Sequence, residues 1–196
     1  MNYSEEAPRE QESLELIHKM INSAKRDIEN DSFHYLLWGW LVFIACTLQF
    51  VLMKMNISFS YIGWMVLMPA GGIASMVYGY KQGKRQRIKT YTDGVIKYVL
   101  IAFLVTLFTV LIFMPRLGLM TYPLIMMVYG LWLFTSGGII QFRPLIIGGM
   151  LNWLLGIISV FLPFEIQLVM LALAVLLGYI VPGYMLKNKY NVSKVA

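Results

Sequence analysis

The sequence predicts an all-α membrane protein, a six-transmembrane-helix bundle with an N-terminal cytoplasmic amphipathic helix. Hydrophobic residues make up 59% of the chain and charged residues only 13%, whereas an average soluble domain is about one-quarter charged. Six apolar blocks alternate with short breaks, and each block has roughly the 17 to 25 residues that cross a hydrocarbon core. Basic residues concentrate at alternate breaks, as they do in multi-pass membrane proteins.

The chain begins with a polar head, residues 1–32, that carries eight acidic and four basic residues. It lacks the basic start and apolar centre of a signal peptide. Five of its apolar residues follow a three-four spacing, which predicts a helix with a narrow apolar seam: Leu14, Ile17, Ile21, Ala24 and Ile28. Two interpretations remain open. In the first, the helix lies against its own bundle or on the membrane surface. In the second, it docks a partner protein or a second copy of the chain. The excess of acidic residues in the head favours contact with protein.

The six apolar blocks form the predicted bundle over residues 33–185: 33–53, 60–80, 98–114, 119–140, 145–161 and 166–185. Only four residues separate the fourth block from the fifth, so a single very long helix is an alternative to two. Pro144 and the charge of Arg143 favour a tight turn at this point. A basic cytoplasmic tail, residues 186–196, follows the last block.

The basic residues predict the orientation, because lysine and arginine near span ends are retained on the cytoplasmic side. With the N-terminus inside, fourteen of the sixteen basic residues fall on inner segments. Only Lys54 and Arg116 fall on outer loops, where Glu165 is the single carboxylate. We therefore expect both termini in the cytoplasm. Aromatic residues at the block edges are expected to form interfacial belts: Tyr35, Trp38, Tyr61, Tyr80, Tyr98, Tyr122 and Tyr184.

Small residues at helical spacing predict the packing faces, since apolar side chains gain little from association inside lipid. These faces are Gly71, Ser75 and Gly79 in the second block, Gly130 and Gly137 in the fourth, Gly148, Asn152 and Gly156 in the fifth, and Ala174 and Gly178 in the sixth. Close packing is the commoner role of such residues, and hinges or a cavity lining are the alternative. The third block has no glycine, so we expect a peripheral helix with more lipid contact.

Polar side chains within the blocks are few. Asn152 lies near the middle of the fifth block, Gln49 lies toward the outer end of the first, and hydroxyl groups include Ser75 and Ser136. A polar group at this depth either bridges two helices or lines a path for a solute. Bridging is the commoner role of a buried amide, and Asn152 is the residue that best separates the two interpretations.

No catalytic or metal site is predicted. The centres of the six blocks contain no Asp, Glu, Lys, Arg or His, which argues against a proton relay, a voltage sensor or an intramembrane protease. Cys46 is the only cysteine, and His18 and His34 have no evident second ligand. The fourteen methionines do not converge on one face and are interpreted as packing residues rather than copper ligands. We therefore expect no cofactor and no nucleic-acid partner.

An inner basic loop follows the second block and contains Lys81, Lys84, Arg85, Arg87 and Lys89. The simplest role of these charges is to fix topology. The same charges also suit anionic lipid headgroups or the acidic head.

The run from Ile17 to Leu52 contains a distinctive stretch from Asp31 to Trp40, DSFHYLLWGW. It resembles the opening of a family of small uncharacterised bacterial inner-membrane proteins that have an N-terminal polar helix and several spans. The resemblance implies a multi-pass protein of the bacterial cytoplasmic membrane. It implies no activity, and no functional residue is carried over from it.

The sequence favours a non-enzymatic role: a scaffold, regulator or signalling component that acts through protein contacts of the N-terminal helix. The expected partners are the lipid bilayer and either another membrane or cytoplasmic protein or a second copy of the chain. The alternative is a channel or facilitator for a small or neutral solute, with a path along Asn152, Ser75 and Ser136. A lipid-modifying enzyme is least favoured, because interfacial chemistry needs a clustered acid, base or metal.

Overall fold

The computed structural model describes residues 32–83 and 91–195, and all regular secondary structure in these two ranges is helical. In chain order the elements are the first helix Ser32–Lys54, α2 Ile62–Gly83, α3 Tyr91–Ile112, α4 Met114–Leu117, the 3-10 turn η1 Gly118–Met120, α5 Thr121–Ile139, α6 Arg143–Ser159, α7 Phe164–Val175, the π-helical turn η2 Leu176–Ile180 and α8 Val181–Val195. The predicted all-α class is therefore confirmed for these residues. The predicted amphipathic head, residues 1–31, lies outside them.

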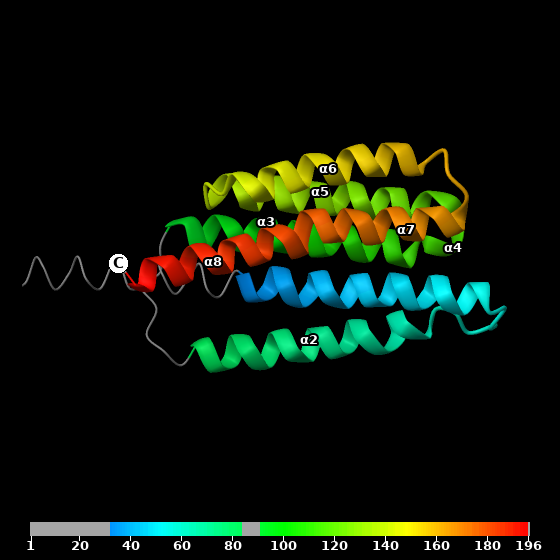
Figure 1. Cartoon of the computed structure of the whole chain (residues 1–196), viewed down its shortest axis with the longest axis horizontal. Coiled ribbons are helices and arrows are strands. Elements are labelled where there is room, and N and C mark those ends of the chain that lie inside the picture. Colours follow the sequence, from blue (N-terminus) through cyan, green and yellow to red (C-terminus); the bar gives the residue numbers. More distant parts are fainter. Residues whose placement is uncertain (1–31, 84–90, 196) are drawn as a thin grey trace, which may run out of the picture.

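The long helices run back and forth along the longest axis of the molecule (Figure 1). One end of the bundle holds the start of the first helix, the α5–α6 turn and α8, and we name it the basic end (Figure 1). Lys81 in the last turn of α2, Arg143 at the start of α6 and Lys187 in α8 belong to this end. Lys54 and Arg116 lie on segments near the opposite end.

Five described helices are long and apolar enough to cross a membrane: Ser32–Lys54, Ile62–Lys81, Gly94–Ile112, Met114–Ile139 and Phe164–Asn188. The 17-residue helix α6 is also apolar but shorter. Large apolar side chains cover the outside of the bundle, among them Met76 at 77% exposure and Ile112 at 72%. So many exposed apolar side chains are unsuited to water and suited to lipid. These features are those of a helical membrane protein.

A tight turn joins α5 to α6, as predicted, in place of one continuous helix. Gln141 adopts the left-handed conformation with a φ of 53°, and the Phe142 amide donates to the Gly137 carbonyl at 2.9 Å. This pattern satisfies the last carbonyls of a helix. Pro144 falls in the first turn of α6, where the absence of its N–H leaves no hydrogen bond unmade.

The third and sixth predicted blocks differ from the helices that the structure has there. The third block is longer than expected, because α3 begins at Tyr91 rather than residue 98. It also ends at Ile112 rather than residue 114, since Pro115 cannot donate to a carbonyl in the preceding turn and the chain starts the short helix α4 instead. In the sixth block, η2 widens the helix into a π turn at Leu176–Ile180, which the sequence analysis did not predict.

The glycines of α6 allow the closest backbone contacts. A Cβ atom added to Gly148 would lie 2.8 Å from the Cα of Gly178 in η2. One added to Gly149 would lie 2.8 Å from the Gly130 carbonyl oxygen of α5. The two adjacent glycines therefore allow close contact with two different helices. A larger residue at either position would have to displace one of those helices. The packing faces predicted for the fourth, fifth and sixth blocks are confirmed at these positions.

The predicted packing face of the second block is only partly correct. Gly71 packs against Leu41 of the first helix. Gly79 has no atom within 4 Å of an added Cβ among the described residues, so no packing contact supports its assignment there. The third block is peripheral, as expected, since only 6% of its apolar stretch in α3 is buried.

Two aromatic residues assigned to the interfacial belts belong to the core instead. Tyr35 is 6% exposed and Tyr122 is 3% exposed. The ring of Tyr35 lies 6.1 Å from that of Tyr179, and the ring of Tyr122 lies 5.2 Å from that of Phe164. Four other predicted belt residues are exposed as expected: Tyr61, Tyr80, Tyr98 and Tyr184.

Candidate functional site

Among the described residues, the buried side-chain amides lie in two places, the α6–α7 interface and the meeting point of the first helix, α2 and α5. Asn152 and Gln167, with the buried hydroxyl of Ser159, belong to the first group. Gln49 is the centre of the second. These groups are the candidate site, because polar atoms inside an apolar bundle are costly unless they pack helices together or bind a ligand.

Asn152, in the middle of α6, has no exposed surface. Its Nδ2 donates to the Gly148 carbonyl one turn earlier, at 2.9 Å, and to the Ala174 carbonyl of α7, at 3.0 Å. The side chain therefore joins α6 to α7 by a hydrogen bond to backbone. Its Oδ1 has no hydrogen-bond partner among the described residues.

The hydrogen bond from Asn152 reaches α7 just before the π-helical turn η2. Ala174 lies two residues ahead of Leu176, where η2 begins. An inserted side-chain donor at this point accompanies the change from α-helical to π-helical hydrogen bonding. Gly178 of η2 leaves the space that the amide occupies, since a Cβ there would collide with Nδ2 of Asn152. Asn152 and η2 thus form one packing unit.

The two serines predicted to share a path with Asn152 lie on other helices. Ser136 of α5 is 2% exposed and donates to the Trp132 carbonyl of its own helix at 2.6 Å. Ser75 of α2 is half-buried, and its Oγ has no hydrogen-bond partner among the described residues. Within residues 32–83 and 91–195, no hydrogen bond joins Ser75, Ser136 and Asn152 to one another.

Gln49, 4% exposed, joins three helices through one oxygen atom. Its Oε1 accepts hydrogen bonds from Trp64 Nε1 of α2, at 2.6 Å, and from the Tyr122 hydroxyl of α5, at 3.0 Å. Sequence reasoning identified Gln49 but missed both donors. The available signal was that an amide inside an apolar block requires partners, and Trp64 and Tyr122 are donors near the same end of the bundle.

Besides Asn152, a second buried amide joins α6 to α7, at the end of the bundle opposite the basic end. Sequence reasoning did not identify it. Gln167 of α7 and Ser159 of α6 both have no exposed surface. Gln167 Nε2 donates to the carbonyls of Ser159, at 3.2 Å, and Leu162, at 3.0 Å. Gln167 Oε1 and Ser159 Oγ have no partner among the described residues. Ser159 lies two helical turns after Asn152, so the two side chains share one face of α6.

The opposite end also carries an ion pair between Lys54 and Glu165. It joins the end of the first helix to the first turn of α7. Both side chains are about half exposed, at 57% and 49%. The Lys54 ammonium also lies 5.7 Å from the ring centroid of Phe50.

The remaining predicted site residues are largely outside the described ranges. The partner seam, Leu14, Ile17, Ile21, Ala24 and Ile28, falls there entirely. Four residues of the inner basic loop do so too: Lys84, Arg85, Arg87 and Lys89. Lys81 is described and is exposed in the last turn of α2. Close to it in sequence, the Tyr78 ring stacks on Phe33 of the first helix with centroids 3.9 Å apart.

Among residues 32–83 and 91–195, no three or more His, Cys, Asp or Glu side chains are grouped so that they could hold a metal ion. Comparisons of the chain with protein-family models, curated proteins and solved structures find no match. Function is therefore inferred from the residues and contacts of the chain itself.

Proposed function

We propose that the chain is a non-enzymatic membrane protein that acts as a scaffold, regulator or signalling component through contacts of its N-terminal head. The observation that carries the proposal is the enclosure of Asn152, which has no exposed surface and donates to two backbone carbonyls. A solute path needs polar groups that water reaches. The polar atoms at the centre of α6 instead hold helices together.

In the proposed topology six helices span the cytoplasmic membrane of a bacterium and both termini are cytoplasmic. The helix α6 has 17 residues, the short end of the range that crosses a ~30 Å hydrocarbon layer. Figure 1 shows α6 running alongside α5 and α7 for most of their length. The basic end faces the cytoplasm in this topology, because Lys81, Arg143 and Lys187 are retained there.

The head provides the protein contact in this proposal. Its eight acidic residues outnumber its four basic ones, which weakens attraction to anionic lipid. The seam of five apolar residues from Leu14 to Ile28 matches the spacing by which one helix docks on another. In this proposal the bundle anchors the protein in the membrane and the head binds a partner. These two features are more typical of a scaffold than of a solute transporter.

Site-specific photocrosslinking in cells tests the proposal with the full-length protein. A photoreactive residue at Ile21 lies in the seam, whereas one at Lys19 lies on the other side of the predicted helix. We expect Ile21, and not Lys19, to form a discrete adduct, and Leu14→Asp to remove it because a charge disrupts the apolar contact. Mass spectrometry of the adduct distinguishes a second copy from another protein.

Two results would contradict the docking role. Equal adducts from both positions would indicate non-specific contact. An adduct formed only within one chain, between Ile21 and the bundle, would show that the head packs on its own bundle.

A facilitator for a small neutral solute is the second candidate, and one observation favours it. Three buried side-chain atoms at the α6–α7 interface have no hydrogen-bond partner among the described residues. They lie between the middle of the interface and the end opposite the basic end: Asn152 Oδ1, Ser159 Oγ and Gln167 Oε1. Unpaired polar atoms of this kind bind water where there is room. Stopped-flow light scattering of proteoliposomes with urea or glycerol separates the candidates. A permeability above that of empty vesicles, abolished by Asn152→Leu, would replace our proposal with this one.

A further inference from the structure

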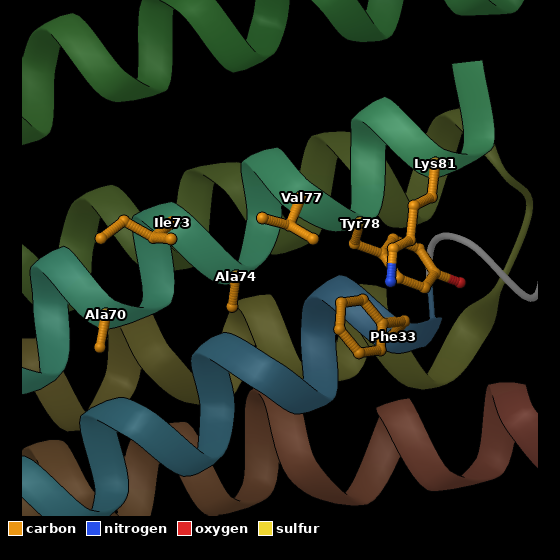
Figure 2. Close-up of a pocket in the computed structure, with 7 residues that line it drawn as sticks. All are labelled: Phe33, Ala70, Ile73, Ala74, Val77, Tyr78 and Lys81. Carbon is orange, nitrogen blue, oxygen red and sulfur yellow. The ribbon is translucent and has the colours of Figure 1, made fainter. Parts of the chain in front are cut away.

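A groove of about 510 Å³ runs along α2 beside the start of the first helix. Figure 2 shows its lining residues, which are Phe33, Ala70, Ile73, Ala74, Val77, Tyr78 and Lys81. All the α2 residues of this set come from one stretch of that helix, and Phe33 comes from the first helix. The lining is apolar except for the Tyr78 hydroxyl and the Lys81 ammonium, which lie together at one end of the groove (Figure 2).

Small side chains make room for the groove, and rings bound it at one end. Ala70 and Ala74 are one turn apart on α2, so their methyl groups leave a shallow channel between larger neighbours. Ile73, 64% exposed, and Val77, 49% exposed, stand beside it. At the Lys81 end, Phe33 and Tyr78 stack with an interplanar angle of 17°.

The stretch of α2 that lines the groove is about as long as one membrane leaflet is thick. The stretch from Ala70 to Lys81 rises ~16 Å at ~1.5 Å per residue, about half of a ~30 Å hydrocarbon core. Lys81 is in the last turn of α2, at the basic end, where a span meets the aqueous interface. The apolar part therefore extends from the headgroup level to about mid-membrane.

We propose that this groove binds a phospholipid with an anionic headgroup. One acyl chain lies along α2 over Ala70 and Ala74, and the phosphate contacts the Lys81 ammonium. The positive charge of Lys81 complements the anionic headgroup. The apolar stretch from Ala70 to Val77 complements the acyl chain in character and length. An acidic peptide, such as the head of this chain, could pair with Lys81 at the interface, but its polar backbone would not suit the apolar stretch over Ala70 and Ala74. The site is independent of the proposed partner of the head.

Native mass spectrometry of the full-length protein tests the binding. The detergent-solubilised protein is given phosphatidylglycerol or phosphatidylcholine with identical acyl chains. We expect the wild type to retain phosphatidylglycerol more strongly. Lys81→Gln should weaken this retention about fivefold, the loss expected for one basic contact near a membrane surface, and leave phosphatidylcholine unchanged. Ala70→Phe should weaken retention of both lipids, because it fills the channel.

Matched controls lie on α3. Lys97→Gln removes an exposed lysine of α3, and Ala102→Phe adds a ring at an exposed alanine of α3. Both should bind lipid like the wild type. Because all four positions are exposed, the variants should share one melting temperature. Equal losses in Lys81→Gln and Lys97→Gln would mean that only general surface charge acts, and would overturn the site.

Photolabelling in vesicles locates the acyl chain. Phosphatidylglycerol with a mid-chain diazirine should label residues 70–77 in preference to α3, and Ala70→Phe should abolish the label there. Even labelling of both helices would overturn the proposal, as would full competition by water-soluble glycerol phosphate, which has no acyl chain. A carbodiimide crosslink from Lys81 to a carboxylate of residues 1–31 would show that the head occupies the mouth of the groove, and would also overturn it.

Discussion

The helices α6 and α2 each contain an adjacent pair of glycines within an apolar stretch, and they use them differently. In α6, Gly148 contacts η2 and Gly149 contacts α5. In α2, Gly71 contacts the first helix, whereas Gly72 has no atom within 4 Å of an added Cβ in the described part of the chain. The same dipeptide therefore marks a helix between two close neighbours in one case and a helix with one neighbour in the other.

How much of a helix is buried depends on its close backbone neighbours rather than on how apolar its sequence is. The apolar stretches of Met114–Ile139 and Phe164–Asn188 are 50% and 44% buried, whereas those of Ile62–Lys81 and Gly94–Ile112 are 11% and 6% buried. By mean hydropathy the α3 stretch is the most apolar of the five, and it is the least buried. Inside lipid, apolar side chains do not drive helices together. Backbone contact at glycines and hydrogen bonds from buried amides distinguish the tightly packed helices from the peripheral ones.

The largest effect is expected where two backbones touch. In Gly149→Ala the new methyl group would meet the Phe134 amide nitrogen at 2.7 Å and the Gly130 carbonyl oxygen at 2.8 Å. Neither backbone atom can rotate away, so α5 and α6 must separate. We expect a loss of about 3 kcal/mol, the upper part of the range for overpacked interiors, measured by reversible unfolding in mixed micelles.

Gly138→Ala is the matched control on α5, because a Cβ there meets no atom within 4 Å among the described residues. Its stability should be unchanged or should rise by up to about 1 kcal/mol, since alanine favours the helix more than glycine does. Equal losses in Gly149→Ala and Gly138→Ala would show that backbone contact does not distinguish the packed helices, and the contrast between α6 and α2 would fail.

The sequence was sufficient to predict the fold class and the α5–α6 turn, because block length, apolarity and Pro144 act locally. It was insufficient to predict which groups meet. Asn152 donates to a backbone carbonyl of α7, and no side chain marks such an acceptor. The π turn at Leu176–Ile180 has no distinctive residue pattern. Tyr122 at a block edge suits an interfacial belt as well as a core, and only its burial against Phe164 and Gln49 in the folded chain distinguishes the two.

The hydrogen bonds of Gln49 are the next test, because they join the less buried first helix and α2 to α5. Gln49→Leu leaves the Trp64 and Tyr122 donors without their acceptor. We expect a loss of about 1 to 1.5 kcal/mol, near the upper values for interhelical hydrogen bonds in membranes. In a double-mutant cycle, Tyr122→Phe should cost less in the Gln49→Leu background than in the wild type. Additive losses would show that the bond contributes nothing to the attachment of these helices.

The smallest effect is expected at the Lys54–Glu165 ion pair, although it joins the same first helix to α7. Both side chains are about half in solvent, so water and salt screen the attraction. Lys54→Gln should cost less than about 1 kcal/mol, and the cost should disappear at high salt. Exchanging the charges with Lys54→Glu and Glu165→Lys should restore the wild-type value. A salt-independent loss larger than that of Gln49→Leu would instead mean that the opposite end of the bundle is fixed by charge, and that buried amides are secondary to it.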